Sequence, residues 1–207
     1  MKVLHVNDTG RFVGGVERIA HDTATGLVQR GWTQGLLHDD ANPAGEFVAG
    51  FSSVGRDLDF AQSFAPDAVL VHKAADPVRV ETLARRYRSI RMVHDHDLVC
   101  LRRHKYFPLG LEICDRPAGL DCYTHLCFVQ RAAPGSRLPI GFSSVSAQRR
   151  LMRANDAMAK IVTISHWMRN ELVMNGFANE RIDIIPPVPA SLTGPSMLAP
   201  KIGRAHV

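Results

Sequence analysis

Two histidines and two aspartates alternate at positions 94–97, directly after the short run SIRMV. A histidine at the end of a buried strand can donate a hydrogen bond to a substrate hydroxyl or phosphate, or act as a general base. Consecutive residues of an extended chain point to opposite sides, so the four side chains do not form one mononuclear metal site. His94 is therefore a candidate for chemistry. The alternative interpretation is a hydrogen-bonded histidine at a strand end.

Gly14 and Gly15 lie at the start of a helix-period pattern that ends near Arg30. Glycine lets backbone N–H groups approach an anion closely, and the helix dipole favours negative charge at that end. Together with Gly10, the pair fits neither the dinucleotide fingerprint G-x-G-x-x-G nor a P-loop, which needs G-K-[ST]. The pattern predicts a phosphate-facing loop, with a tight turn and close helix–sheet packing as the alternative.

Three acidic residues lie in or directly after this predicted helix and the strand that follows it. Glu17, in the first turn of this helix, suits the positive end of the helix dipole. Asp39 and Asp40 follow the second predicted strand, where a dinucleotide enzyme carries the acid that binds a ribose. A nicotinamide- or flavin-dependent Rossmann enzyme is therefore an alternative function.

Four cysteines and two histidines are interleaved in a segment without clear periodicity: Cys100, His104, Cys114, Cys122, His125 and Cys127. In a cytosolic chain such ligands favour tetrahedral zinc, which would stabilise a segment that buries little apolar surface. We therefore expect structural zinc at the four cysteines. Because the spacing lacks a C-x-x-C pair, buried free thiols or a redox-labile disulfide are the alternatives.

The net charge of +5 and an isoelectric point near 9.3 indicate an anionic partner. One basic group lies within residues 79–91, and a second group lies beside the cysteines: Arg102, Arg103 and Lys105. Nucleic acid, a phosphorylated ligand or an anionic membrane surface would each explain this charge, and solvated helix faces are the alternative for the first group. No aromatic-rich basic strand is present, so nucleic acid is not the expected partner.

Strands and helices that must position these residues alternate along the chain. Apolar runs predict strands at residues 3–6, 33–38, 68–72, 89–94, 160–165 and 182–185, with 46–51 as a further short strand. Helical spacing with proline and glycine boundaries predicts helices at 15–30, 58–64, 77–87, 146–156 and 166–175. This alternation is typical of an α/β fold with a doubly wound, mainly parallel, Rossmann-like sheet.

Residues 1–189 are predicted to form one domain, interrupted by an irregular, cysteine-rich insert at 95–143. The proline-rich stretch 186–189 is predicted to be a stiff linker, leading through 190–201 toward a second domain. Residues 202–207 look like a translated sequencing adapter, so we expect the natural protein to continue. The sequence shows neither a signal peptide nor an apolar run long enough to span a bilayer, which favours a cytoplasmic location.

The order and spacing of these motifs resemble glycosyltransferase family 4. Gly14-Gly15-Val16-Glu17 is similar to its G-G-x-E helix start, and His94-Asp95 is similar to its H-D after the fourth strand. Residues 159–165, Gly176-Phe177 and 181–186 are similar to the end of its amino-terminal domain. The four-cysteine insert resembles that of a subset of the family.

The resemblance implies the amino-terminal half of a GT-B fold, in which two Rossmann-like domains face each other across a cleft. Such enzymes transfer a hexosyl-type group from a nucleotide-sugar to an acceptor, with retention of anomeric configuration and without an essential active-site metal. By this resemblance Gly14, Gly15, Glu17 and Asp95 would bind the donor phosphates or lie at the reacting centre. His94 would contact the transferred sugar or the acceptor as the catalytic residue.

Arg102, Arg103 and Lys105 would help to hold a glycan, a small molecule or a lipid-linked acceptor, the last with peripheral association at the inner face of the membrane. The chain departs from the family pattern at Pro187, which replaces the usual asparagine, and it lacks the carboxyl-terminal domain with its E-x7-E pair. We therefore expect it to fold and to be inactive alone. A zinc-stabilised basic binding module is a further alternative.

Overall fold

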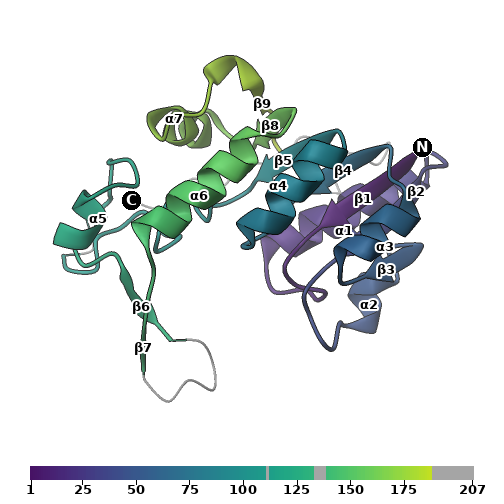
Figure 1. The fold of residues 1–207 in the computed structure, drawn as a ribbon, viewed down its shortest axis with the longest axis horizontal. Coiled ribbons are helices and arrows are strands. Elements are labelled where there is room, and N and C mark those ends of the chain that lie inside the picture. Colours follow the sequence, from purple (N-terminus) through teal and green to yellow (C-terminus); the bar gives the residue numbers. More distant parts are fainter. Residues whose placement is uncertain (111, 133–138, 188–207) are drawn as a thin grey trace, which may run out of the picture.

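The computed structural model describes residues 1–110, 112–132 and 139–187, and its central element is a seven-stranded sheet (Figure 1). The strands are parallel and lie in the order β3-β2-β1-β4-β5-β8-β9. They are β1 (Lys2–Val6), β2 (Thr33–Leu37), β3 (Ser53–Gly55), β4 (Ala68–Val71), β5 (Ser89–Val93), β8 (Lys160–Thr163) and β9 (Ile182–Ile184). The expected doubly wound, Rossmann-like α/β fold is confirmed.

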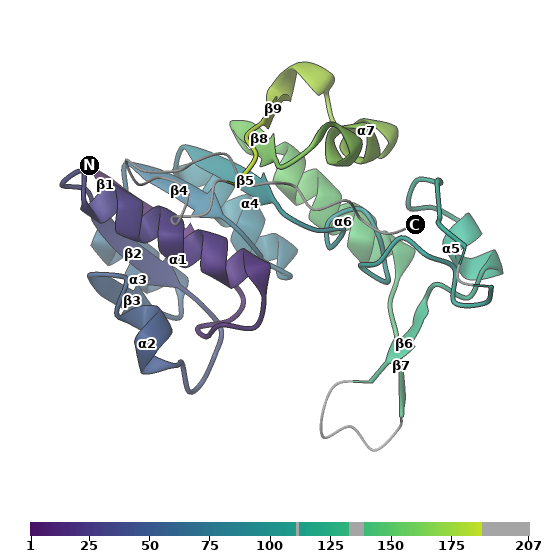
Figure 2. The same cartoon turned by 180° about the vertical axis from the view of Figure 1, so that it is seen from behind.

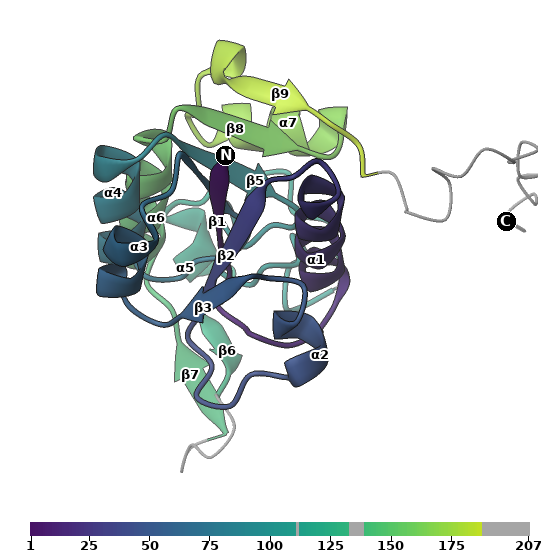
Figure 3. The same ribbon diagram turned by 90° about the vertical axis from the view of Figure 1, so that its right-hand side faces the viewer.

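Helices cover both faces of this sheet (Figure 3). α1 (Gly15–Val28) and α2 (Gly45–Val48) lie on one face. The other face carries α3 (Leu58–Phe64), α4 (Pro77–Arg86) and α6 (Val145–Asp156), and α7 (His166–Met174) contacts β9. Because each central strand is covered on both sides, its residues are apolar on both sides, as in the run Val3-Leu4 of β1.

Two apolar layers hold the helices to the sheet. Leu4 and Val69 pack on the α3/α4/α6 face with Leu83, and Leu36 packs on the other face with Phe47 of α2. All five side chains have no exposed surface. Burying a side chain of this size stabilises the fold by roughly 1.5–3 kcal/mol relative to leaving it in water.

The first helix is set by its two ends. Gly14 precedes it in extended backbone, and its N–H donates to the Glu17 side chain in the first turn. Gly31 lies beyond the last turn at φ +77°, the left-handed conformation that favours glycine at a helix stop. These ends place the amino terminus of α1 at the carboxyl edge of β1.

The insert forms its own small structure beside the sheet (Figures 1 and 2). It contains α5 (Asp121–Thr124) and an antiparallel hairpin of β6 (Val129–Arg131) and β7 (Ile140–Phe142), which the sequence did not predict. A buried ion pair of 2.7 Å between Lys105 Nζ and Glu171 Oε2 joins the insert to α7. Ala118 N–H also donates to Asn175 Oδ1, at 2.8 Å.

Most predicted elements match the observed ones, with two exceptions before residue 56. The expected strand at 46–51 is wrong, because Gly45–Val48 is helical and turns Phe47 into the core. The observed strand is Ser53–Gly55, which pairs with β2 and was not predicted. The expectations for residues 188–207, including the linker and adapter stretches, lie outside the described residues. Among the helices that the structure describes, none is long and apolar enough to cross a membrane.

Candidate functional site

The loop between β1 and α1 is tied together by short polar contacts. Asn7 Nδ2 donates to the backbone oxygen of Thr9 at 2.8 Å and to its hydroxyl at 3.0 Å. The Thr9 hydroxyl donates to Glu17 Oε1 at 3.2 Å, and Glu17 Oε2 accepts from Gly14 N–H at 2.9 Å. Glu17 is buried, and both of its oxygens are engaged inside the protein. Its carboxylate therefore fixes the helix end instead of facing a ligand.

The two glycines at this helix end are not required by packing. A Cβ atom added at Gly15 would meet nothing within 4 Å, and at Gly14 its nearest neighbour would be Glu17 Oε2 at 3.8 Å. At Gly10, by contrast, a Cβ atom would lie 2.8 Å from Pro43 Cβ. Close packing therefore explains Gly10 but not Gly15. The open space at Gly15 leaves the first turn of α1 accessible to an anion.

Asp95 lies at the carboxyl end of β5 beside Lys73. Its Oδ2 is 3.5 Å from Lys73 Nζ, and its Oδ1 accepts from Asp97 N–H at 2.8 Å. Burial raises the pKa of Asp95, but the Asp97 hydrogen bond and the Lys73 charge outweigh it, so the pKa lies below its usual value. Asp95 is thus an ionised, oriented carboxylate.

His94 is largely buried under α1, and burial together with the Arg91 charge lowers its pKa to about 4. The carboxylates of Asp95 and Glu17 are close enough to oppose this shift. His94 also lines a cavity of about 490 Å³ with Ile19 and Thr23 of α1. The structure therefore brings His94 together with the helix that begins at Gly15. We call Gly14, Gly15, Glu17, His94 and Asp95 the edge site.

Asp39 and Asp40, the two acids on which the dinucleotide-enzyme alternative depends, each pair with an arginine of this protein. Asp39 Oδ1 pairs with Arg79 Nη1 at 2.6 Å. Asp40 Oδ2 pairs with Arg11 Nε at 3.2 Å and accepts from Gly10 N–H at 2.6 Å. Each carboxylate therefore has an arginine partner within the protein, which weakens that alternative.

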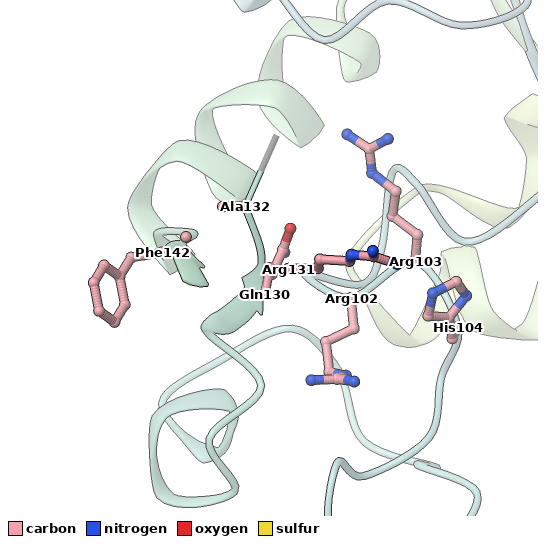
Figure 4. Close-up of a pocket in the computed structure, with 8 residues that line it drawn as sticks. Arg102, Arg103, His104, Gln130, Arg131, Ala132 and Phe142 are labelled. Atoms are coloured by element: carbon pink, nitrogen blue, oxygen red, sulfur yellow. The ribbon is translucent and has the colours of Figure 1, made fainter. Parts of the chain in front are cut away.

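A second cavity, of about 600 Å³, lies between the insert hairpin and the segment that follows Leu101 (Figure 4). Its basic lining residues are Arg102, Arg103, His104 and Arg131, and we call this cavity the basic pocket. Gln130 also lines it and donates to the backbone oxygen of Leu101 and, at 2.8 Å, to Ser143 Oγ.

The guanidinium groups of the basic pocket come from two segments, and the ring of Phe142 points away from them (Figure 4). Arg102 Nη1 donates to the backbone oxygen of Val129 at 3.1 Å, which holds the first segment against β6. Arg131 was missed by sequence analysis, because only the hairpin brings it close to Arg103. Lys105 does not join the pocket, since it is buried and paired with Glu171.

The structural zinc expected at Cys100, Cys114, Cys122 and Cys127 is not supported. Across the described ranges, which include all four cysteines, no group of three or more histidine, cysteine or acidic side chains is placed to hold a metal ion. All four thiols are free. Burial and the neighbouring thiols raise the pKa of Cys127 to about 11, so it is a neutral thiol. The alternative of free thiols fits this arrangement.

No model of a known protein family matches the sequence, and no curated protein matches it. Among solved structures, the chain is similar to Alr3699/HepE of Anabaena in complex with UDP-glucose, at 13% identity and a TM-score of 0.56, over 90% of this chain and 43% of that one. It is also similar to the lipopolysaccharide outer core galactosyltransferase WaaB in its apo form, at 9% identity and a TM-score of 0.51, over 91% and 46%. The chain therefore spans less than half the length of both structures. At this identity the likeness shows the fold.

Proposed function

We propose that this chain is the acceptor-side, amino-terminal domain of a family 4 glycosyltransferase. The enzyme would transfer a hexosyl-type group from a nucleotide-sugar to a glycan, lipid-linked or small-molecule acceptor, with retention of configuration. The observation that carries the proposal is that the accessible amino terminus of α1 at Gly15 and His94 lie at the same edge of a parallel sheet, where Glu17 of the first turn of α1 is close enough to act on the charge of His94. Ligands of open α/β sheets bind at that edge. The names of the structural neighbours, one a galactosyltransferase and one bound to UDP-glucose, support it.

The residues of the edge site would have different roles in binding the substrates. The Gly15 end of α1 would bind a donor phosphate through backbone N–H groups and the helix dipole. Gly14 N–H donates to Glu17, so these two residues would orient the helix end instead of contacting the phosphate. Asp95, held by Lys73, would bind a hydroxyl of the substrate, and His94 would contact the transferred sugar.

The basic pocket would hold the phosphate of a phosphorylated or lipid-linked acceptor. Three guanidinium groups around one cavity fit the several oxygens of a phosphate or pyrophosphate, because guanidinium presents a fork of N–H donors. With a lipid-linked acceptor, the protein would work at the inner face of the membrane. Arg102 and Arg103 keep the role expected from the sequence, Arg131 joins them, and Lys105 acts structurally.

We expect a second domain to supply most of the nucleotide pocket, since the chain spans less than half the length of both structural neighbours. The 207-residue chain should therefore bind ligands without turning them over. Incubation with UDP-glucose and sugar acceptors should give no transfer product. Transfer at an ordinary enzymatic rate would contradict the need for a second domain while supporting the reaction.

Two alanine substitutions in α1 test the phosphate-binding role. Gly15→Ala places a methyl group in open space at the accessible helix end, and Gly26→Ala places one in open space within the same helix. Neither should harm the fold, and alanine favours a helix over glycine by roughly 0.5–1 kcal/mol in its interior. In amide NMR titrations with UDP-glucose, the resonances of Gly15, Val16 and His94 should shift. Gly15→Ala should weaken the response, whereas Gly26→Ala should not.

The same titrations separate the alternatives. Tighter binding of NAD than of UDP-glucose would favour the nicotinamide-dependent enzyme. Equal binding by the two variants, or UDP-glucose shifts confined to other residues, would remove the amino terminus of α1 from the proposed site.

A further inference from the structure

Two buried histidines and a buried glutamine form one continuous hydrogen-bonded chain that ends at half-buried His94. Gln34 Oε1 is 2.9 Å from His5 Nε2, and His5 Nδ1 is 3.0 Å from His72 Nε2. His72 Nδ1 is 3.2 Å from His94 Nε2. Neighbouring rings are nearly parallel, at interplanar angles of 3° and 8°, so their in-plane nitrogens meet edge to edge.

The sheet register explains why these side chains meet. Gln34 is on β2, His5 on β1, and His72 and His94 follow β4 and β5, which are consecutive neighbours in the sheet. His5 pairs with Leu36, two residues beyond Gln34, and with Leu70, two residues before His72. Leu70 in turn pairs with Ile90, four residues before His94. The hydrogen-bonded chain therefore crosses four strands diagonally, on the α1 face. Each member lies two residues closer to the carboxyl edge of the sheet than the member from the preceding strand.

Burial keeps all three imidazoles neutral at physiological pH. His5 and Gln34 have no exposed surface, and His72 is 2% exposed. Burial lowers the pKa of His5 to about 4, although the Gln34 hydrogen bond opposes the shift. Burial, followed by the neighbouring histidines, lowers the pKa of His72 well below its usual value. A neutral imidazole has one nitrogen that donates and one that accepts.

One end of the chain fixes the protons of all three rings. The structure places the Gln34 carbonyl oxygen against His5 Nε2 and leaves the Gln34 amide nitrogen without a partner among the described residues. An oxygen at this position can only accept, so His5 Nε2 carries the hydrogen and His5 Nδ1 accepts. The same rule then assigns the hydrogen to His72 Nε2 and to His94 Nε2. The remaining nitrogen, His94 Nδ1, is left with a lone pair. It is buried and has no hydrogen-bond partner in the part of the chain that the structure describes.

The chain orients His94 but does not conduct a proton away from it. If His94 Nδ1 took up a proton, the charge could pass along the rings only as far as the Gln34 amide, which does not accept a proton near neutral pH. A carboxylate at that end would stabilise an imidazolium, as in a catalytic triad. An amide leaves His94 a neutral acceptor of a hydrogen bond.

We propose that Gln34, His5 and His72 are positioning residues that fix His94 as the Nε2–H tautomer, so that its Nδ1 accepts a hydrogen bond from a substrate hydroxyl. The assignment of that hydroxyl to a sugar rests on the proposed function. An unprotonated phosphate oxygen cannot donate a hydrogen bond, so it would face the lone pair and be disfavoured. The edge site would then distinguish a hydroxyl at His94 from a phosphate at Gly15.

The tautomers are measured directly in a two-bond ¹H–¹⁵N correlation spectrum of the ¹⁵N-labelled chain, which separates protonated from unprotonated ring nitrogens. We expect the hydrogen on Nε2 in His5, His72 and His94. A hydrogen on His94 Nδ1 would overturn the proposal. The wild-type spectrum measures the tautomers without any catalysis. A failure of this inference is therefore distinguishable from a failure of the proposed function.

Three variants test the role of Gln34. Gln34→Met removes the terminal acceptor and should give a mixture of tautomers at His94, whereas Gln34→Glu keeps an accepting oxygen and, through its negative charge, should favour an imidazolium in the hydrogen-bonded chain. His38→Gln is the matched control, because His38 directly follows β2, is 1% exposed and is not part of the hydrogen-bonded chain. It should leave the three rings unchanged. A single Nε2–H tautomer at His94 in Gln34→Met would remove Gln34 from the proposal.

Titration with UDP-glucose and with UDP tests the substrate contact. The His94 Nδ1 resonance should move with UDP-glucose, whose sugar carries hydroxyls, and stay unchanged with UDP. An equal response to both would point to a contact with the shared nucleotide and overturn the hydroxyl assignment. A response to neither would remove His94 from the proposed glycosyltransferase site, while the tautomer order would stand on the wild-type spectrum.

Discussion

The edge site and the basic pocket are built in opposite ways. At the edge site, parallel strands and one helix end fix each group, and the Glu17 and Asp95 carboxylates are both held by hydrogen bonds. In the basic pocket, arginines from an irregular segment and a short hairpin surround a cavity, and its lining includes apolar Phe142. We therefore propose that the edge site carries the chemistry and that the basic pocket binds a charged group. The following changes test this comparison.

The largest effect should come from the ion pair that ties the insert to the domain. Lys105→Met leaves Glu171 buried without its partner, and losing one member of a buried pair costs about 3–5 kcal/mol. Urea unfolding should show this loss. Replacing both residues with apolar ones should recover much of the stability, since no uncompensated charge then stays buried. If Lys105→Met were as stable as the wild type, the pair would not anchor the basic pocket.

The next effect should be catalytic and confined to the edge site. In an enzyme that joins this domain to its donor domain, His94→Ala should lower kcat about a hundredfold, the cost of removing one oriented hydrogen-bonding group from a reacting centre. Arg103→Ala should instead raise KM for a phosphorylated acceptor. Steady-state kinetics with both variants separate the two roles. A raised KM with unchanged kcat in His94→Ala would make the edge site a binding site only.

Acid should destabilise the domain through His5 and His94. The pKa values of His5 and His94 are lowered to about 4 in the folded protein. Below the ordinary value near 6.5, these two histidines therefore bind protons in the unfolded chain but stay neutral in the folded one. Stability should be unaffected above about pH 7 and fall between about pH 6.5 and pH 4. At pH 5 the loss is about 2 kcal/mol for each histidine.

Urea unfolding at pH 7 and pH 5 measures this loss. His5→Gln should reduce the difference between the two pH values, although it lowers stability at pH 7. His125→Gln, in the insert, is the control, because His125 stacks on Phe107 outside the histidine chain. A pH dependence that is unchanged in His5→Gln would contradict the prediction.

The smallest effect should be at the basic pocket, where single charges share one anion. Arg103→Ala or Arg131→Ala should weaken the binding of inorganic pyrophosphate by about 0.2–1 kcal/mol, the contribution of a contact between solvent-exposed charges. Added salt should reduce that difference. Arg86→Ala, on the exposed end of α4, is the control and should change nothing. Isothermal titration that shows equal losses in all three variants would indicate general attraction to a basic protein.

The alternation of apolar runs and helical patterns was enough to predict most of the sheet and its helices, because both depend on local spacing. Prediction failed at 46–51, where Phe47 and Phe51 fit a strand as well as the helix that the core selects. It also failed for the hairpin, whose strands pair three residues each. The zinc expectation is not supported, because the other three thiols are close enough to raise the pKa of Cys127 but the four form no group placed to hold a metal ion among the described residues.

By itself, the sequence determined the fold class, the glycines at the start of the first helix and the histidine after the fifth strand. These follow from residue type and position along one element. Only the tertiary structure decided that His5, His72 and Gln34 lie in one hydrogen-bonded chain with His94, because their contacts depend on a register between four strands. It also decided that Lys105 is structural and Arg131 lines the pocket. Contacts between distant segments arise from packing, which no local pattern encodes.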